Sequence, residues 1–306
     1  MKEMRRLDVP AKKDLLERGR TSVVRSFEIS REDGERLQKE RPELIAAREA
    51  GVMLLNPQGG RVWLSYGFAS IDALRREFRP MLEGLAKSLK ASEAKGGIYL
   101  RFTDQPNRSY TEPVLEECFF ELRHEWMEMT LAELPEERLP GDEIAPGFLF
   151  RAAVPTEYEA IAALDQAAFG DDSLHGDYVA EFAQRATELR VLEERASARL
   201  VGYVGLFSEG ERVGEVNPIA VHSDFQRRGL GEAMMRWTLA WFRHQGMRRA
   251  RLFVISDNNA AIALYRKLGF VPGQRGLTYR RPADKKELAE MAKKRTGTFV
   301  KFGGWR

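Results

Sequence analysis

One short segment carries residue types that suit the binding of a phosphate group. It consists of Gln226, Arg227, Arg228, Gly229, Leu230 and Gly231, followed by Glu232. Glycine lets a backbone come close to a ligand, and the first N–H groups of a helix have no partner within the helix. Because the helix dipole adds positive potential there, a helix that begins at this segment would bind a pyrophosphate.

The segment is predicted to join a strand to a helix. Residues 215–221 form the predicted strand, and residues 229–245 a helix whose apolar side chains cover more than one stripe. Helices of this kind lie buried against a sheet. A strand over 249–256 and a helix over 259–268, ended by Gly269, are predicted next.

The residues ahead of this unit continue the same alternation of strands and helices. Strands are predicted over 148–154, 190–194 and 200–208, and helices over 156–169 and 177–188. A polar stretch with two prolines, over 133–142, is typical of a linker. The chain of 306 residues therefore favours two domains.

The first half repeats part of this plan. Arg75-Arg76 matches the arginine pair of the segment at an offset of 152 residues, and the strand 97–102 matches 249–254 at the same offset. A constant offset indicates a tandem duplication, with chance similarity of two short units as the alternative.

The two copies differ where the ligand would lie. The offset places Glu77 opposite Gly229 and Arg79 opposite Gly231. A glutamate there would block the approach of the backbone and repel phosphate, so the first half is not expected to bind the same ligand.

Two motifs resemble those of a known family. Ile219, Ala220 and Val221, followed by the segment, resemble the acyl-CoA signature of the GNAT superfamily of N-acetyltransferases. The second signature is matched by Asn258, Ala261, Ile262, Leu264, Tyr265, Gly269 and Phe270. The resemblance implies an α/β (α+β) protein with two tandem GNAT-like domains, each a mixed, mostly antiparallel twisted sheet flanked by helices.

The resemblance also implies a division of the chain. Residues 1–135 would form a degenerate GNAT-like domain without the cofactor motif, and residues 136–147 a linker. A catalytic GNAT domain would cover 148–282, and a basic C-terminal tail 283–306. The first domain would pack on the active one and imitate the second subunit of a family dimer, so a monomer or a homodimer is expected.

Acetyl-CoA is the cofactor that the resemblance implies. Its pyrophosphate would lie on the N–H groups from Arg227 to Glu232, and its pantetheine beside Ile219 to Val221 like an added strand. That strand is expected to splay from the one that starts at Arg249. Asn258 would contact the cofactor or order the site, with a plain helix N-cap as the alternative.

The implied reaction moves an acetyl group from the thioester directly to an amine. Tyr265 would protonate the leaving thiolate, unless it is a core tyrosine whose hydroxyl bonds to the backbone. Glu215 is the candidate base, with a surface carboxylate as the alternative. A backbone N–H near Val221 is the expected donor to the oxyanion.

The acceptor is expected to be the primary amine of a small molecule. Three aspartates in the loop 169–178 suit a cationic amine, with a solvated acidic loop as the alternative. Phe253 stands where the ribosomal-protein alanine acetyltransferases carry a glutamate. This difference weakens the case for a protein amine as the substrate. The alternative from another functional class is a regulator that binds acyl-CoA without catalysing a reaction.

Composition bears on the cellular compartment and on metal binding. Residues 1–20 lack the apolar stretch of a signal peptide, and the single cysteine, Cys118, suits a reducing compartment. No histidine stands at metal-ligand spacing from another or from Cys118. These features predict a cytoplasmic enzyme without a metal or a membrane segment, and no nucleic-acid partner is expected.

Overall fold

The structure is a computed structural model that describes residues 12–26, 29–58, 61–90, 92–93, 96–103, 108–170, 176–209 and 212–299. It consists of two compact units. The first comprises Met1–Glu125 and Gly276–Arg306, and the second comprises Trp126–Arg275.

The first unit is a sheet with strand order β2-β3-β4-β5-β13, and β1 pairs with β4. The strands are β1 (Val24–Arg25), β2 (Ile45–Arg48), β3 (Gly51–Gln58), β4 (Arg61–Phe68), β5 (Ile98–Thr103) and part of β13 (Val271–Arg281). The helices are α1 (Lys12–Thr21), α2 (Arg31–Glu40), α3 (Ile71–Ala86), α4 (Arg108–Glu117) and α9 (Lys285–Phe299). Among the strand pairs that the structure describes in this unit, only β4 and β5 are parallel, and the others are antiparallel.

An aromatic core occupies the first unit where β4 leaves β5. The parallel ladder ends at Leu64, which pairs with Leu100. Beyond it, Tyr66 and Phe68 are fully buried and pack against Phe78 of α3, with the Tyr66 and Phe78 rings 5.3 Å apart edge to face. The first unit therefore fills the region beside β4, beyond the end of its ladder with β5, with its own side chains.

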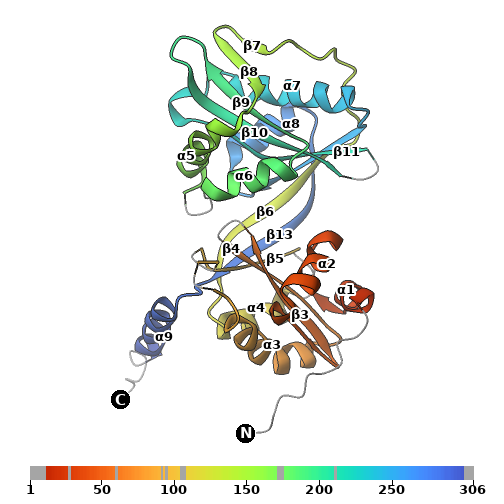
Figure 1. Cartoon of the computed structure of the whole chain (residues 1–306), viewed down its shortest axis with the longest axis vertical. Helices are drawn as coiled ribbons and strands as arrows, with labels where there is room; N and C mark the ends of the chain where they lie inside the picture. Colours follow the sequence, from red (N-terminus) through yellow and green to blue (C-terminus); the bar gives the residue numbers. More distant parts are fainter. Residues whose placement is uncertain are drawn as a thin grey trace, which may run out of the picture. The chain divides into compact units, whose positions relative to one another are not determined.

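The second unit is a sheet with strand order β6-β12-β11-β10-β9-β8-β7. The strands are β6 (Glu121–Leu131, of which Trp126–Leu131 belong here), β7 (Glu143–Ala145), β8 (Phe148–Ala152), β9 (Glu188–Glu194), β10 (Arg199–Glu209), β11 (Val213–Val221) and β12 (Arg249–Ile255). The helices are α5 (Tyr158–Phe169), α6 (Gly176–Arg185), α7 (Leu230–His244) and α8 (Asn259–Lys267). Among the described strand pairs of this unit, only β11 and β12 are parallel neighbours. Figure 1 shows these strands with the helices α5 to α8 around them.

Helices cover both faces of the second sheet. On one face α7 and α8 bury an apolar cluster that includes Met234, Phe242 and Leu252. On the other face α5 and α6 pack over β9 and β10, in a cluster that includes Val191 and Tyr203. Each unit is therefore a mixed, mostly antiparallel sheet with flanking helices, which confirms the predicted fold class.

The two halves of the chain exchange one strand each. Residues Trp126–Leu131 of β6, from the first half of the sequence, pair with β12 in the second unit. Residues Gly276–Arg281 of β13, from the second half, pair with β5 in the first unit. The predicted domain limits 1–135, 136–147, 148–282 and 283–306 stay a prediction; the compact units change instead between Glu125 and Trp126 and between Arg275 and Gly276.

The predicted counterpart of the phosphate segment in the first half was misplaced. Arg75-Arg76 and Glu77 lie inside α3, which Ser70 caps two residues after β4 ends. In the second unit residues 222–229 separate β11 from α7. The offset of 152 holds for the parallel strand pairs but not for the helices, so the first unit lacks the loop altogether.

A second pair of equivalent elements supports the duplication. The N–H of Phe120 donates to the carbonyl of Leu115 at 2.9 Å, and the N–H of Phe270 donates to that of Tyr265 at 3.0 Å. The first turn follows α4 in the first unit, and the second turn follows α8 in the second unit. The two helices are equivalent, because each comes after the second strand of the parallel pair. Leu115 therefore stands where Tyr265 stands, and the first unit carries no hydroxyl at this position.

The described ranges are free of two kinds of feature, a membrane-spanning helix and a cluster of metal ligands. No helix there is both long and apolar enough to cross a membrane. Nor does this part of the chain gather three or more histidine, cysteine, aspartate or glutamate side chains in a way that could hold a metal ion.

Candidate active site

The phosphate segment forms a tight loop at the start of α7. Gly229 is the N-cap of the helix and has a φ of 78°, and Arg227 has a φ of 60°. When residues with left-handed backbone conformations alternate with right-handed ones, successive N–H groups point toward one place. This arrangement makes a concave site for an anion. Gly229 meets this requirement without the strain that a side chain would add.

The N–H groups of this loop are open toward a ligand, as far as the described ranges show. The first recorded backbone bond of the helix runs from the N–H of Ala233 to the carbonyl of Gly229, at 3.0 Å. For the N–H groups from Arg227 to Glu232, the described residues supply no partner. A Cβ on Gly229 would meet open space, so an anion can reach these donors.

Side chains of the segment hold the loop in shape. The Gln226 side-chain amide donates to the carbonyl of Val221 at 2.9 Å, and the Arg228 guanidinium donates to the carbonyl of Asp224 at 2.8 Å. The Arg228 guanidinium also lies 4.8 Å from the centre of the Phe225 ring. Gln226 and Arg228 thus fix the backbone, while Arg227 is exposed to solvent.

Glu232 does not repel a phosphate, because cations neutralise it. Its carboxylate lies 2.6 Å from the Lys267 ammonium and 3.0 Å from the Arg236 guanidinium. These two hydrogen bonds, first that of Lys267, lower the pKa of Glu232. Leu230, next to the N-cap, is buried in the core and anchors this end of the helix.

A gap opens between β11 and β12. The parallel ladder runs from Val213 paired with Arg249 to Val216 paired with Leu252, and then ends. Both strands continue, β11 to Val221 and β12 to Ile255. The backbone edge of β11 beyond Val216 is therefore open on the side of β12, as the splay predicted for this strand requires.

The three motif residues on β11 remain paired with β10 on their other side. Ile219, Ala220 and Val221 pair with Val204, Tyr203 and Gly202, respectively. The N–H of His222 donates to the carbonyl of Val201 on β10, at 2.8 Å. Because successive N–H groups of a strand alternate in direction, the N–H of Val221 points away from β10, into the gap.

Tyr265 is almost fully buried on α8. It belongs to the apolar cluster beneath α7, and its ring lies 6.0 Å from that of Phe270. Burial raises the pKa of Tyr265 to about 12. Its hydroxyl has no hydrogen-bond partner among the described residues, which differs from the backbone-bonded hydroxyl of an ordinary core tyrosine.

The loop, the gap and α8 meet at one end of the sheet. A Cβ on Gly231 would lie 3.8 Å from the Leu264 side chain and 4.0 Å from that of Val221. Leu264 lies on α8 immediately before Tyr265, so the start of α7, the end of β11 and α8 are neighbours. Tertiary structure thus brings the two sequence motifs together.

Asn258 is an N-cap. Its side-chain oxygen accepts a hydrogen bond from the N–H of Ala261 at 3.1 Å, at the first turn of α8. The structure accounts for Asn258 by this local role. A contact with a cofactor stays a prediction.

Glu215 lies on β11 within an ion pair that the sequence did not reveal. Its carboxylate lies 2.7 Å from the guanidinium of Arg251, the residue opposite it on β12, and accepts a bond from the Asn217 amide at 3.2 Å. Glu215 is buried. Because each carboxylate oxygen can accept two hydrogen bonds, and Arg251 occupies Oε2 with two nitrogens, one acceptor site remains on Oε1 for a water or an amine.

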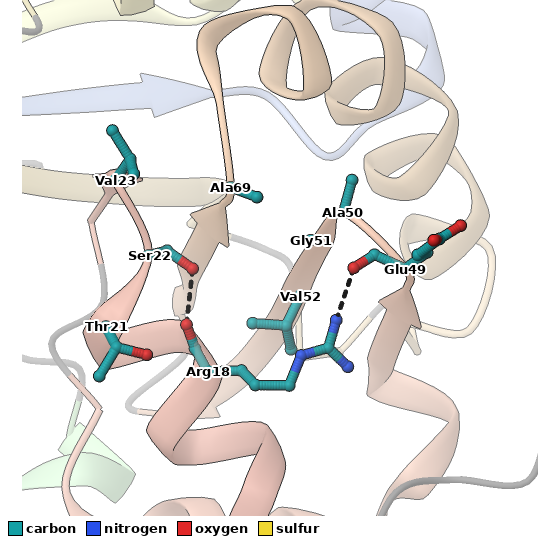
Figure 2. Close-up of a pocket in the computed structure, with 9 residues that line it drawn as sticks. All are labelled: Arg18, Thr21, Ser22, Val23, Glu49, Ala50, Gly51, Val52 and Ala69. Atoms are coloured by element: carbon teal, nitrogen blue, oxygen red, sulfur yellow. Dashed lines mark hydrogen bonds between the residues drawn. The ribbon is translucent and has the colours of Figure 1, made fainter.

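The acidic loop predicted to suit a cationic amine is only partly described. In the acidic loop 169–178, residues 171–175 lie outside the described residues. A cavity of about 270 Å³ lies in the first unit, away from the predicted residues, between the end of α1 and the start of β3 (Figure 2). Its Arg18 guanidinium is bound by the carbonyls of Arg48 and Glu49, at 2.7 and 3.0 Å, so the cavity does not coincide with the candidate chemistry.

Comparison with known proteins agrees with this geometry. The sequence profile of the acetyltransferase (GNAT) family matches residues 158–270. A mycothiol acetyltransferase from Streptomyces coelicolor is 33% identical over 175 residues, which cover 53% of this chain and 53% of that protein. The chain spans about half the length of the curated relatives it matches.

Two solved structures share the fold. A tandem GNAT protein from the clavulanic acid biosynthesis pathway superposes with a TM-score of 0.56 at 13% identity, covering 89% of this chain and 95% of that one. A GCN5-related N-acetyltransferase from Sphaerobacter thermophilus has a TM-score of 0.56 at 16% identity, over 76% of this chain and 77% of its own. The profile match over residues 158–270, with both motifs at one site, therefore identifies a domain of the acetyltransferase (GNAT) family within the second unit.

Proposed function

We propose that the second unit binds acetyl-CoA and transfers its acetyl group to a primary amine of a small molecule. The observation that carries this proposal is the gap between β11 and β12, which begins after Val216 and ends at the open N–H groups of the phosphate loop. Pantetheine would pair with the free edge of β11 as an added strand does. The pyrophosphate would lie on the N–H groups at the start of α7.

Direct attack on the thioester requires three groups around the carbonyl carbon. The N–H of Val221 points into the gap and would stabilise the oxyanion. Tyr265 would give its proton to the leaving thiolate, since burial keeps its hydroxyl protonated. The Glu215 carboxylate would take the proton of the ammonium group, directly or through a water, so that the free amine attacks.

A small acceptor is supported by the relatives named mycothiol acetyltransferase, which match about half of this chain. The first unit is proposed to be a non-catalytic copy. It lacks the loop between its β4 and α3, and Leu115 stands in the place of Tyr265.

Release of the free thiol from acetyl-CoA tests this function. The purified chain is mixed with acetyl-CoA and a panel of primary amines that includes an amino sugar, an amino acid amide and a diamine. Thiol release that depends on one of these amines is the expected result. Tight binding of acetyl-CoA without release for any amine would favour a regulator that only binds acyl-CoA.

A further inference from the structure

One strip of side chains lies on the face of the second sheet that is turned away from α7 and α8. Antiparallel pairing of β12 and β6 sets Arg251 opposite Thr130, Phe253 opposite Glu128 and Ile255 opposite Trp126. The residues between them belong to the apolar cluster under α7 and α8 (Met127, Met129, Leu252, Val254). Because side chains alternate along a strand, the six strip residues share the opposite face, and Glu215 joins it beside Arg251.

The strip passes the mouth of the gap. Phe253 is the first residue of β12 beyond Leu252, where the ladder with β11 ends. Glu128 is its direct neighbour on β6, and directly opposed Cβ atoms of antiparallel strands lie about 5 Å apart. Glu128 therefore stands one strand away from the place where the thioester would lie.

Glu128 is the carboxylate of the strip whose charge is not balanced. The charge of Glu215 is balanced by Arg251, at 2.7 Å. Glu128 forms no ion pair with any described residue and is half-buried. On β13 its neighbour is Gly273, where an added Cβ would come within 3.4 Å of the Glu128 Oε2 atom. The absence of a side chain at Gly273 leaves that oxygen uncovered.

Aromatic rings lie beside this carboxylate. Phe253, opposite Glu128, meets Trp126 edge to face with ring centres 5.4 Å apart. A carboxylate next to aromatic rings suits an ammonium group, because the charge pairs with the oxygen while the rings favour a desolvated cation.

We propose that Glu128 is a substrate-binding residue that holds the ammonium group of a cationic acceptor at the mouth of the gap. The inference rests on the proposed function and adds the acceptor class. It also makes β6, a strand from the first half of the sequence, part of the acceptor site of the second unit. The site is then incomplete without the exchanged strand.

A substitution that removes only the charge tests this role. Glu128→Gln should raise the KM for a cationic primary amine about 10-fold to 100-fold, because a hydrogen bond to a charged group contributes about 1.5–3 kcal/mol. The KM for acetyl-CoA should stay within about twofold, since the pantetheine would pair with β11, on the other side of the gap from Glu128. Glu128→Asp, which keeps the charge, should retain more of the affinity than Glu128→Gln.

Two comparisons separate charge recognition from a general loss of structure. Hydroxylamine, a neutral acceptor, should be affected much less than a cationic amine. Glu136→Gln removes one negative charge beside Arg243, at the far end of α7, and should leave the KM for the cationic amine unchanged. Retained binding of coenzyme A in a thermal-shift assay shows that each variant is folded.

The outcomes distinguish this inference from the proposed function. If the unaltered chain releases thiol with amines and Glu128→Gln keeps the same KM for them, Glu128 has no role in the acceptor site and the function stands. If the unaltered chain releases no thiol with any amine, the proposed function is wrong, and the role of Glu128 with it.

Discussion

Tyr265 is the residue on which the proposed chemistry depends most. Its ring is packed in the core below α7, yet its hydroxyl has no partner among the described residues. The hydroxyl is not among the fully buried side-chain polar atoms that lack a partner, so its oxygen reaches solvent while the ring is buried. We infer that the hydroxyl is kept for a ligand, which on the proposed function is the sulfur of the cofactor.

Replacing the hydroxyl alone tests this role. Tyr265→Phe should lower kcat by about 10²-fold to 10⁴-fold, the range for loss of a general acid. The KM for acetyl-CoA should change little, because the ring keeps its packing. Tyr158→Phe, at the start of α5, serves as a matched control. Steady-state kinetics with the best amine give both constants, and unchanged turnover in Tyr265→Phe would remove the tyrosine from the mechanism.

The pKa of the same group predicts the pH dependence of the rate. Burial raises the pKa of Tyr265 to about 12, so the proton that the acid must donate is retained as the pH rises and is lost only near that value. The kcat measured from pH 7 to roughly pH 11 should therefore show no descending limb. A fall of kcat centred near pH 9 would contradict Tyr265 as the acid.

At the scale of elements, one strand–loop–helix unit makes the cofactor site. β11 supplies the open edge, residues 222–229 the loop, and α7 the free N–H groups. The loop requires a left-handed residue at its end, which Gly229 provides. In the first unit the same strand runs into α3 after two residues, so its helix begins without such a loop.

Adding a methyl group to this glycine should weaken cofactor binding. Gly229→Ala forces a side chain into a left-handed conformation, at a cost of about 1–2 kcal/mol, and places a Cβ in the space that the anion would use. The Kd for coenzyme A should rise about 10-fold, as measured by calorimetry. Gly246→Ala is the matched control, because Gly246 has a φ of 80° and open space at the other end of α7. An equal change in both variants would mean that strain alone, not the site, is responsible.

At the scale of the whole molecule, the exchanged strands make each unit depend on both halves of the chain. Leu277 of β13 and Met129 of β6 are fully buried, the first in the core of the first unit and the second in the core of the second. Neither half of the sequence therefore contains a complete sheet. This arrangement makes separate expression of the halves at residue 135 or 148 unfavourable.

Two reciprocal substitutions test the exchange. Leu277→Ala should destabilise the first unit, and Met129→Ala the second, each by about 2–5 kcal/mol for a large-to-small change in a core. Hydrogen exchange followed by mass spectrometry should show faster exchange in β3 and β4 for the first variant and in β10 and β11 for the second. The opposite pattern would contradict the exchange of strands.

Much of the site follows from local sequence. The strand predicted over 215–221 lies within β11, and the helix predicted from Gly229 begins at Leu230 with Gly229 as its cap. These elements are set by short-range signals, namely the glycines, the apolar period and the helix ends. The two motifs and the family they indicate were therefore accessible from the sequence.

Pairing between distant strands was decided only by the tertiary structure. The ion pair of Glu215 with Arg251, the place of Glu128 opposite Phe253 and the exchange of β6 and β13 all depend on register. A one-residue change of register moves every side chain to the other face of a sheet, and local periodicity does not encode it. Matching Arg75 to Arg227 failed for the same reason, because equal spacing along the chain did not mean an equal place in the fold. The sequence by itself determined the chemistry of the loop, and the long-range contacts determined which side chains surround it.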